Sequence, residues 1–174
     1  MGNQVFANGQ INLAKSPDNN LERTAYAFCA GDMLTVVLDQ DGEITWNWGA
    51  KPADGIPQQQ PIKTLVKNLN RWRRGETAKY LHTGSMKKPY EVICEEAVLE
   101  RNFVDSKLFV PKILTSAWES SEKEFGQFLV NYQREPVTCT VCLPKREFTV
   151  TLQNGEVRIV SGNATLEIPP LSAV

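Results

Sequence analysis

Apolar residues near position 62 recur with the period of one helix face. They fall at i, i+3, i+4, i+7 and i+10, which predicts an amphipathic helix: Ile62, Leu65, Val66, Leu69 and Trp72. Pro61 suits the first turn of a helix, and Gly75 suits its end. The pattern therefore predicts a helix over about residues 61–74, with Trp72 on the face that enters the core.

A second helix is predicted from a capping signal combined with apolar residues. Ser116 and Glu119 have the spacing of a capping box, in which two side chains satisfy backbone N–H groups of the first helical turn. The apolar face of this helix would comprise Trp118, Phe125, Phe128, Leu129 and Tyr132. We expect an amphipathic helix over about residues 116–134.

Strand patterns dominate the C-terminal third of the chain. Residues that favour strands gather there in four runs: Val137–Val141, Glu147–Leu152, Glu156–Val160 and Ala164–Ile168. Asn154-Gly155 is a favoured hairpin turn, because both residues tolerate positive φ. These runs and the two helices predict an α+β fold with a mainly antiparallel sheet built from two or more hairpins.

The N-terminal part contains a further hairpin signal. Asp41-Gly42 is a turn pair typical of hairpins. The runs that flank it are Met33–Asp39 and Glu43–Trp48. Residues 1–23 are polar and predict an arm or edge strands. Residues 24–174 are expected to form a single compact α+β domain, with a flexible Pro/Gly/Gln loop at about 49–61.

The length and composition suit one globular domain. The chain has 174 residues, of which 41% are apolar, enough for a core. No apolar run reaches the ~18 residues of a membrane span. The first residues lack the basic and apolar regions of a signal peptide. We therefore expect a cytoplasmic protein that does not bind a membrane.

Charge is segregated along the chain, although the net charge is only −1. Residues 62–90 contain eight Lys and Arg side chains and one acidic side chain, Glu76. The rest of the chain contains eleven basic and nineteen acidic side chains. A local excess of basic residues favours an anionic partner.

The basic segment 62–90 predicts a site for nucleic acid or another polyanion. Four of its cations form one stripe on the predicted helix, about 16 Å long: Lys63, Lys67, Arg71 and Arg74. Such a row neutralises phosphates without reading the base sequence. Supporting contacts are expected from Arg73, Lys79, Lys87 and Lys88, with Tyr80 or Trp48 as a platform for base stacking.

Other interpretations of the chain stay open at this stage. The basic segment is also typical of the solvated side of an amphipathic helix, and it suits an acidic protein surface as a partner. The polar arm, the Pro/Gln loop and exposed hairpin edges favour a protein-interaction or assembly subunit, for instance of a phage-like or secretion particle. A homo-oligomer would be one form of such an assembly.

Catalysis is the most distant alternative. Cys139 and Cys142 form a single CxxC pair, whereas structural zinc normally needs four ligands, so no metal or cofactor is expected. A cysteine-dependent enzyme would use Cys94 with His82 as its base, or the Cys139/Cys142 pair. Nothing in the spacing supplies an acidic partner or an oxyanion hole. We expect a binding protein without catalytic residues and with reduced thiols.

Overall fold

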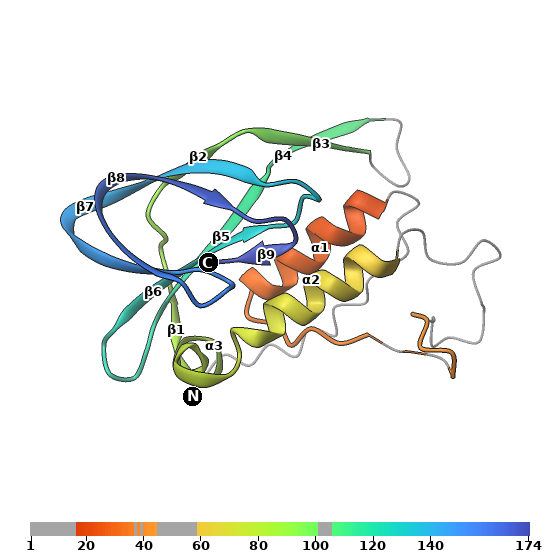
Figure 1. Ribbon diagram of the computed structural model, residues 1–174, viewed down its shortest axis with the longest axis horizontal. Coiled ribbons are helices and arrows are strands. Elements are labelled where there is room, and N and C mark those ends of the chain that lie inside the picture. Colours follow the sequence, from red (N-terminus) through yellow and green to blue (C-terminus); the bar gives the residue numbers. More distant parts are fainter. Residues whose placement is uncertain (1–16, 37, 39, 45–58, 101–105) are drawn as a thin grey trace.

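The computed structural model describes residues 17–36, 38, 40–44, 59–100 and 106–174. In this part of the chain, two longer helices lie beside a curved system of antiparallel strands (Figure 1). The α+β fold class predicted from the sequence is therefore confirmed. The helical segments are α1 (Pro17–Cys29), α2 (Gln59–Arg71), the 3₁₀ turn η1 (Gly75–Thr77) and α3 (Ala78–Thr83).

Every pairing between the described strands is antiparallel. The three sheets have the orders β1-β5-β6-β9, β2-β7-β8 and β3-β4. Their strands are β1 (Ser85–Lys87), β2 (Val92–Cys94), β3 (Glu96–Glu100), β4 (Lys107–Pro111), β5 (Ile113–Glu119), β6 (Phe125–Asn131), β7 (Val137–Thr151), β8 (Val157–Ile168) and β9 (Ser172–Ala173).

The first core lies between the two long helices and the four-stranded sheet. Helices α1 and α2 pack against each other and against β5, β6 and β9. Phe128 of β6 makes edge-to-face contacts with Phe28 and Trp72, with ring centroids 5.5 Å and 6.0 Å away. Trp72 is buried, as the helical pattern predicts. Burying each such aromatic side chain contributes about 1.5–3 kcal/mol.

Helix α2 confirms the helix expected over 61–74, with small differences at its ends. It begins at Gln59, so Pro61 lies in the first turn, where its missing N–H costs no hydrogen bond. The regular helix ends at Arg71. Gly75, with φ of +67°, then redirects the chain into η1.

The second core lies on the other face of β5 and β6. Leu129 faces it from β6 and Ile113 from β5, and they pack against buried residues of the β7–β8 hairpin, including Leu166 and Ile168. Because side chains alternate along a strand, Phe128 points into the first core and Leu129 into the second. From Phe128 onward, strand β6 is therefore buried on both faces.

The prediction of a helix over 116–134 is wrong. This segment is the end of β5, a tight turn and all of β6. Ser116 caps no helix; its hydroxyl accepts a hydrogen bond from the Trp118 indole N–H at 3.1 Å. A strand buried on both faces has a nearly continuous apolar run, which periodicity cannot distinguish from a buried helix.

The C-terminal runs are strands, but they are longer than predicted. The four runs merge into two bent strands, β7 and β8, with a register shift between Cys142 and Glu147. The turn at Asn154-Gly155 is confirmed. Gly155 has φ of +88°, and the Asn154 side-chain oxygen accepts a hydrogen bond from the Glu156 N–H at 2.9 Å.

The N-terminal predictions fall partly outside the described residues. Residues 17–23 are the first half of α1 rather than an arm or edge strand, and residues 1–16 lie outside the described part. The hairpin at Asp41-Gly42 is represented by one antiparallel bridge, Leu38 to Ile44. The loop expected at 49–61 also lies outside it up to residue 58.

Candidate functional site

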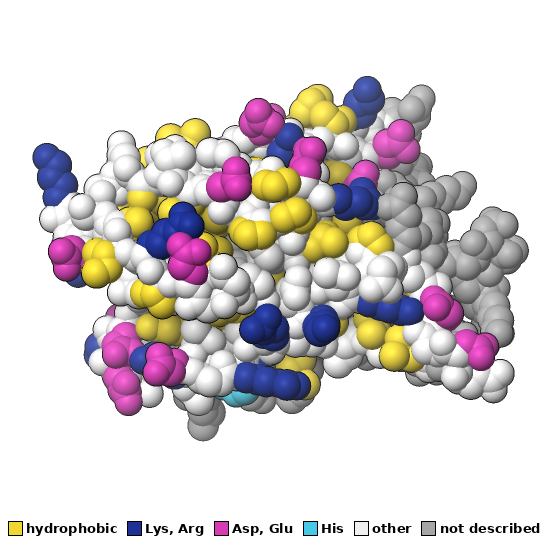
Figure 2. All heavy atoms as spheres, viewed as in Figure 1, with side chains coloured by type: hydrophobic (Ala, Val, Ile, Leu, Met, Phe, Trp, Pro, Cys, Tyr) yellow, Lys and Arg dark blue, Asp and Glu magenta, His cyan; other side chains and the backbone are white. Residues whose placement is uncertain are grey.

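The exposed side of α2 and the turn after it carry three of the predicted phosphate-binding cations. Lys67, Arg71 and Arg74 are exposed, and none of their charged groups has an ion pair or hydrogen bond with another described residue. They lie away from the face on which Leu65 and Leu69 are buried. Figure 2 shows Lys and Arg side chains gathered where Figure 1 places α2 and the turn after it.

Lys63, at the start of the same stripe, has local partners. Its ammonium group donates to the Gly42 carbonyl oxygen at 2.7 Å and pairs with the Glu43 carboxylate at 3.3 Å. The Gln59 side-chain oxygen accepts a hydrogen bond from the Ile44 N–H at 2.7 Å. These contacts tie the 41–44 turn to the first turns of α2, so part of the Lys63 charge is compensated.

Arg73 points toward the core instead of the solvent. Its guanidinium donates to the Asp32 carbonyl oxygen and lies 5.9 Å from the centroid of the Phe28 ring. Burial lowers the pKa of Arg73, and the nearby Asp32 carboxylate partly offsets this effect. Arg73 therefore fastens the end of α2 to the segment that follows α1.

Two further cations of the basic segment contact the acidic turn between β5 and β6. Lys79 of α3 pairs with Glu124, and this hydrogen bond raises the pKa of Lys79. Lys87 of β1 pairs with Glu119 at 3.2 Å. Contacts with Lys123 and Lys87 lower the pKa of Glu119. The acidic turn therefore neutralises much of the charge that residues 76–90 add to the segment.

Of the two aromatic residues predicted to stack on bases, only Tyr80 lies in the described part of the chain. Tyr80 lies with its ring against Gly126, where a Cβ atom would come within 3.0 Å of three ring atoms. The Lys79 ammonium lies 5.5 Å from the centroid of the same ring. Burial raises the pKa of Tyr80. Trp48 lies outside the described residues, and Lys88 is exposed just after β1.

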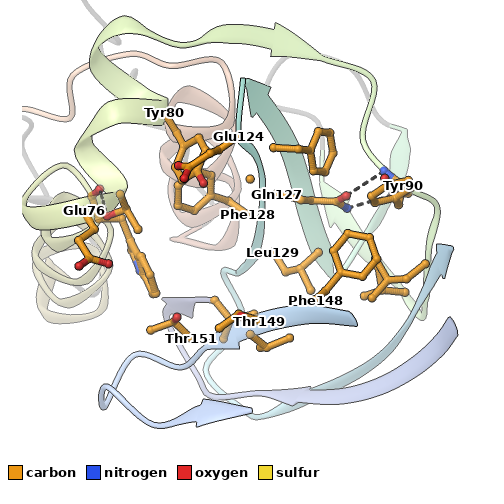
Figure 3. A pocket seen from close by; sticks show the side chains of 18 of the residues that line it. Glu76, Tyr80, Tyr90, Glu124, Gln127, Phe128, Leu129, Phe148, Thr149 and Thr151 are labelled. Atoms are coloured by element: carbon orange, nitrogen blue, oxygen red, sulfur yellow. Dashed lines mark hydrogen bonds between the residues drawn. The ribbon is translucent and has the colours of Figure 1, made fainter. Parts of the chain in front are cut away.

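A cleft of about 630 Å³ lies beside α3, between β6 and the bent half of β7. Figure 3 shows Tyr80 and Phe128 on one side of it and Tyr90 and Phe148 on the other, with Thr149 on the β7 side. The sequence patterns do not predict this cleft. Its walls come from segments far apart in the chain, so no local pattern could indicate it.

The aromatic end of the cleft is held in place by one side-chain amide. Gln127 accepts a hydrogen bond from the Tyr90 N–H at 2.8 Å and donates to the Tyr90 carbonyl oxygen at 3.0 Å (Figure 3). The Tyr90 ring lies 5.0 Å from Phe125 and 5.6 Å from Phe148, between ring centroids. The Arg146 guanidinium covers Phe148 at 4.9 Å. This wall is therefore preorganised.

The residues considered for catalysis do not form a reactive cluster. All four cysteines are free thiols. Burial raises the pKa of Cys139 to about 11, which opposes thiolate formation at neutral pH. His82 is exposed on α3. The described residues contain no group of three or more His, Cys, Asp or Glu side chains that could hold a metal ion.

Comparisons with known proteins found no matching family model, curated protein or solved structure. None of the described helices is long and apolar enough to cross a membrane. The features of the described residues that bear on function are the basic face of α2, the cleft and the exposed apolar residues of the strands.

Proposed function

We propose that the exposed face of α2 binds the phosphate backbone of nucleic acid through Lys67, Arg71 and Arg74. The observation that carries this proposal is that these three cations follow one another along the chain and have no partner among the described residues. At 1.5 Å rise per residue, Lys67 and Arg71 lie about 6 Å apart along the axis of α2, and Arg74 follows in the turn after the helix. Phosphates of one duplex strand advance about 3.4 Å each, so the row can reach about three of them.

Binding by so few cations is weak and sensitive to salt. Each phosphate neutralised contributes about 0.9 to the logarithmic salt slope for duplex DNA and about 0.7 for a single strand. Three contacts therefore predict a slope of about 2–3. Lys63, Arg73, Lys79 and Lys87 already have protein partners, so they contribute less. Backbone contacts carry no base information, so little sequence preference is expected.

The test is fluorescence anisotropy of labelled single-stranded and duplex oligonucleotides at low and near-physiological salt. Charge reversal by Lys67→Glu with Arg71→Glu should abolish binding, because it replaces two attractive contacts with repulsive ones. The matched control is Lys107→Glu with Lys145→Glu, which changes the net charge equally at exposed positions of β4 and β7. Equal loss in both double variants, or unchanged binding in the first, would contradict the proposal.

A second candidate function is self-assembly through the two-stranded sheet β3-β4. Val98 and Phe109 are paired across this sheet, and they are 52% and 61% exposed. Contiguous exposed apolar residues mark sites of protein interaction. The partner we infer for this ribbon is a second copy of the chain.

Sedimentation velocity over a range of concentrations tests the self-assembly. The wild type should form a dimer or larger species, and Phe109→Ser should shift it toward monomer. Ile159→Ser is the matched control, because Ile159 is also an exposed apolar residue but lies on β8. A wild type that stays monomeric at every concentration would exclude this candidate.

A further inference from the structure

The cleft follows a strand edge that is only partly occupied. Strand β9 pairs with β6 at Val130 and Asn131. Next to this pair, Leu129 and Val174 exchange two backbone hydrogen bonds, of 2.9 Å and 3.0 Å. No described strand continues this pairing along Phe125–Phe128. The edge of β6 is therefore occupied at one end and open along the rest.

The open part of this edge faces the cleft. Five consecutive residues of β6, Phe125–Leu129, line it. Their side chains alternate between the two faces of the sheet, so the feature that all five share is the strand edge. Since Leu129 bonds to Val174, strand alternation directs the backbone N–H and C=O groups of Phe125 and Gln127 toward the same side. These groups point into the cleft.

The opposite wall is also a strand edge. Residues 146–151, the bent half of β7, line the cleft consecutively. On one side this half of β7 pairs with β8. On its other side β7 pairs with β2 at Cys139–Val141, and the Cys142 N–H donates to the Glu91 carbonyl. Within the described residues, the cleft therefore separates two strand edges that lack a partner there.

We propose that the cleft binds an extended peptide segment of a partner, which adds to the edge of β6 in line with β9. Main-chain hydrogen bonds to Phe125 and Gln127 would supply affinity, and alternate side chains would enter the walls on either side. Four residues of an extended strand span about 14 Å. The cleft volume of about 630 Å³ lies within the ~300–1,000 Å³ range of ligand sites.

The aromatic residues that line the cleft favour an apolar segment of the partner. Lys79 is paired with Glu124, and Lys123 is paired with Glu119 at 3.2 Å. Glu76, Arg146 and Glu147 also line the cleft and are exposed. Much of the remaining lining is aromatic or aliphatic, and Gln127 holds Tyr90 in place. An apolar residue at alternate positions of the peptide would pack on these rings. A charged residue packed on these rings would lose hydration.

The test uses an acetylated and amidated hexapeptide of alternating threonine and valine, added to ¹⁵N-labelled protein and followed by NMR. We expect shift changes and slower amide hydrogen exchange at Phe125 and Gln127, with a Kd of about 1 mM or tighter. The same peptide with N-methyl groups on alternate residues cannot donate the strand hydrogen bonds. It should bind at least about tenfold more weakly.

A pair of protein variants locates the site. Thr149→Trp places a large ring in the cleft and should abolish peptide binding. Thr138→Trp makes the same change at an exposed position of β7 that does not line the cleft, and it should bind normally. Far-UV dichroism spectra establish whether both variants fold. The comparison with the N-methylated peptide uses the wild-type protein, so it does not depend on the folding of either variant.

Several outcomes would overturn the proposal. These are the absence of any shift at about 1 mM peptide, shifts confined to residues away from the cleft, or equal binding of the N-methylated peptide. Equal binding by the two tryptophan variants would also overturn it. None of these results depends on the exposed face of α2, so the proposed peptide site and the proposed nucleic-acid site can be contradicted independently of each other.

Discussion

At the residue scale, Gly31 shows how one position fixes the end of a helix. After α1, the Gly31 N–H donates to the Phe28 carbonyl at 2.9 Å and the Asp32 N–H donates to the Ala27 carbonyl at 2.9 Å. This is the Schellman arrangement, which requires a left-handed residue, and Gly31 has φ of +90°. A Cβ atom at Gly31 would also lie 2.7 Å from the Trp118 ring.

Gly31→Ala should therefore destabilise the protein by about 2–5 kcal/mol. The left-handed conformation costs a residue with a Cβ about 1–2 kcal/mol, and overpacking against Trp118 adds about 1–3 kcal/mol. Gly155→Ala is the control, since Gly155 has φ of +88° but no atom within 4 Å of the added Cβ. Denaturant unfolding should show the larger loss for Gly31→Ala; equal losses would mean that the Trp118 contact has no effect.

Buried thiols give the stability a defined dependence on pH. Burial raises the pKa of Cys29 to about 12 and that of Cys139 to about 11, from 9.0. Between pH 9.0 and the raised pKa of each thiol, the unfolded chain loses the thiol proton while the folded chain keeps it. The stabilisation is therefore complete below about pH 9 and is lost as the pH rises, with a slope of up to about 1.4 kcal/mol per pH unit for each thiol.

Denaturant unfolding at about pH 8 and about pH 10 measures this effect. The wild type should lose stability at the higher pH. The double variant Cys29→Ala with Cys139→Ala should lose less across the same interval, even if it is less stable at the lower pH. A variant that is as sensitive to pH as the wild type would show that other groups cause the dependence.

At the element scale, strand pairing places two cysteines opposite each other. The register aligns Cys94 of β2 with Cys139 of β7. The Cys142 N–H donates to the Glu91 carbonyl at 2.9 Å, so alternation makes Cys94 and Cys139 a non-hydrogen-bonded pair. In such pairs the Cα atoms are only about 4.5 Å apart and the side chains are closest. Cys142 lies further along β7.

Mild oxidation with oxidised glutathione should therefore join Cys94 to Cys139. The two thiols lose two protons and two electrons, which reduce the glutathione disulfide to two thiols. Peptide mapping by mass spectrometry without reduction identifies the linked pair. Cys142 is an internal control that should stay unlinked to Cys94. A Cys94–Cys142 link as the main product would show that the β2–β7 register is wrong.

At the scale of the whole molecule, β6 joins the two cores. Phe128 packs among the helices on one face, and Leu129 packs against the β7–β8 hairpin on the other. Both side chains are almost fully buried, at 3% and 4% exposure. Damage to either core therefore acts on the same strand, and we expect the described structure to unfold as one cooperative unit.

Phe128→Ala should cost about 3–5 kcal/mol and Leu129→Ala about 2–5 kcal/mol. Each variant should move one shared transition, so far-UV dichroism and tryptophan fluorescence should report the same midpoint. Ile159→Ala is the control, because Ile159 is 68% exposed, and it should stay within about 0.5 kcal/mol of the wild type. Separate midpoints for the two probes would mean that the cores unfold independently.

The sequence by itself determined the elements whose signals are local. The α2 helix follows from five apolar residues on one face, and the turn at Asn154-Gly155 follows from the conformations that these two residues allow. The exposed cations of α2 belong to the same local pattern, because a helix fixes which side chains share a face. Helix α1 was missed, although Gly31 marks its end, because its first half is polar.

Only the tertiary structure decided what depends on contacts between distant segments. Residues 116–134 became a strand pair because β5 pairs with β6 and both faces of β6 are covered, which periodicity within one segment cannot show. The charges of Lys79 and Lys87 are compensated by ion pairs with carboxylates at the acidic turn, more than thirty residues away in the chain. The cleft exists because two strand edges meet beside α3, and such a meeting depends on the packing of the whole chain.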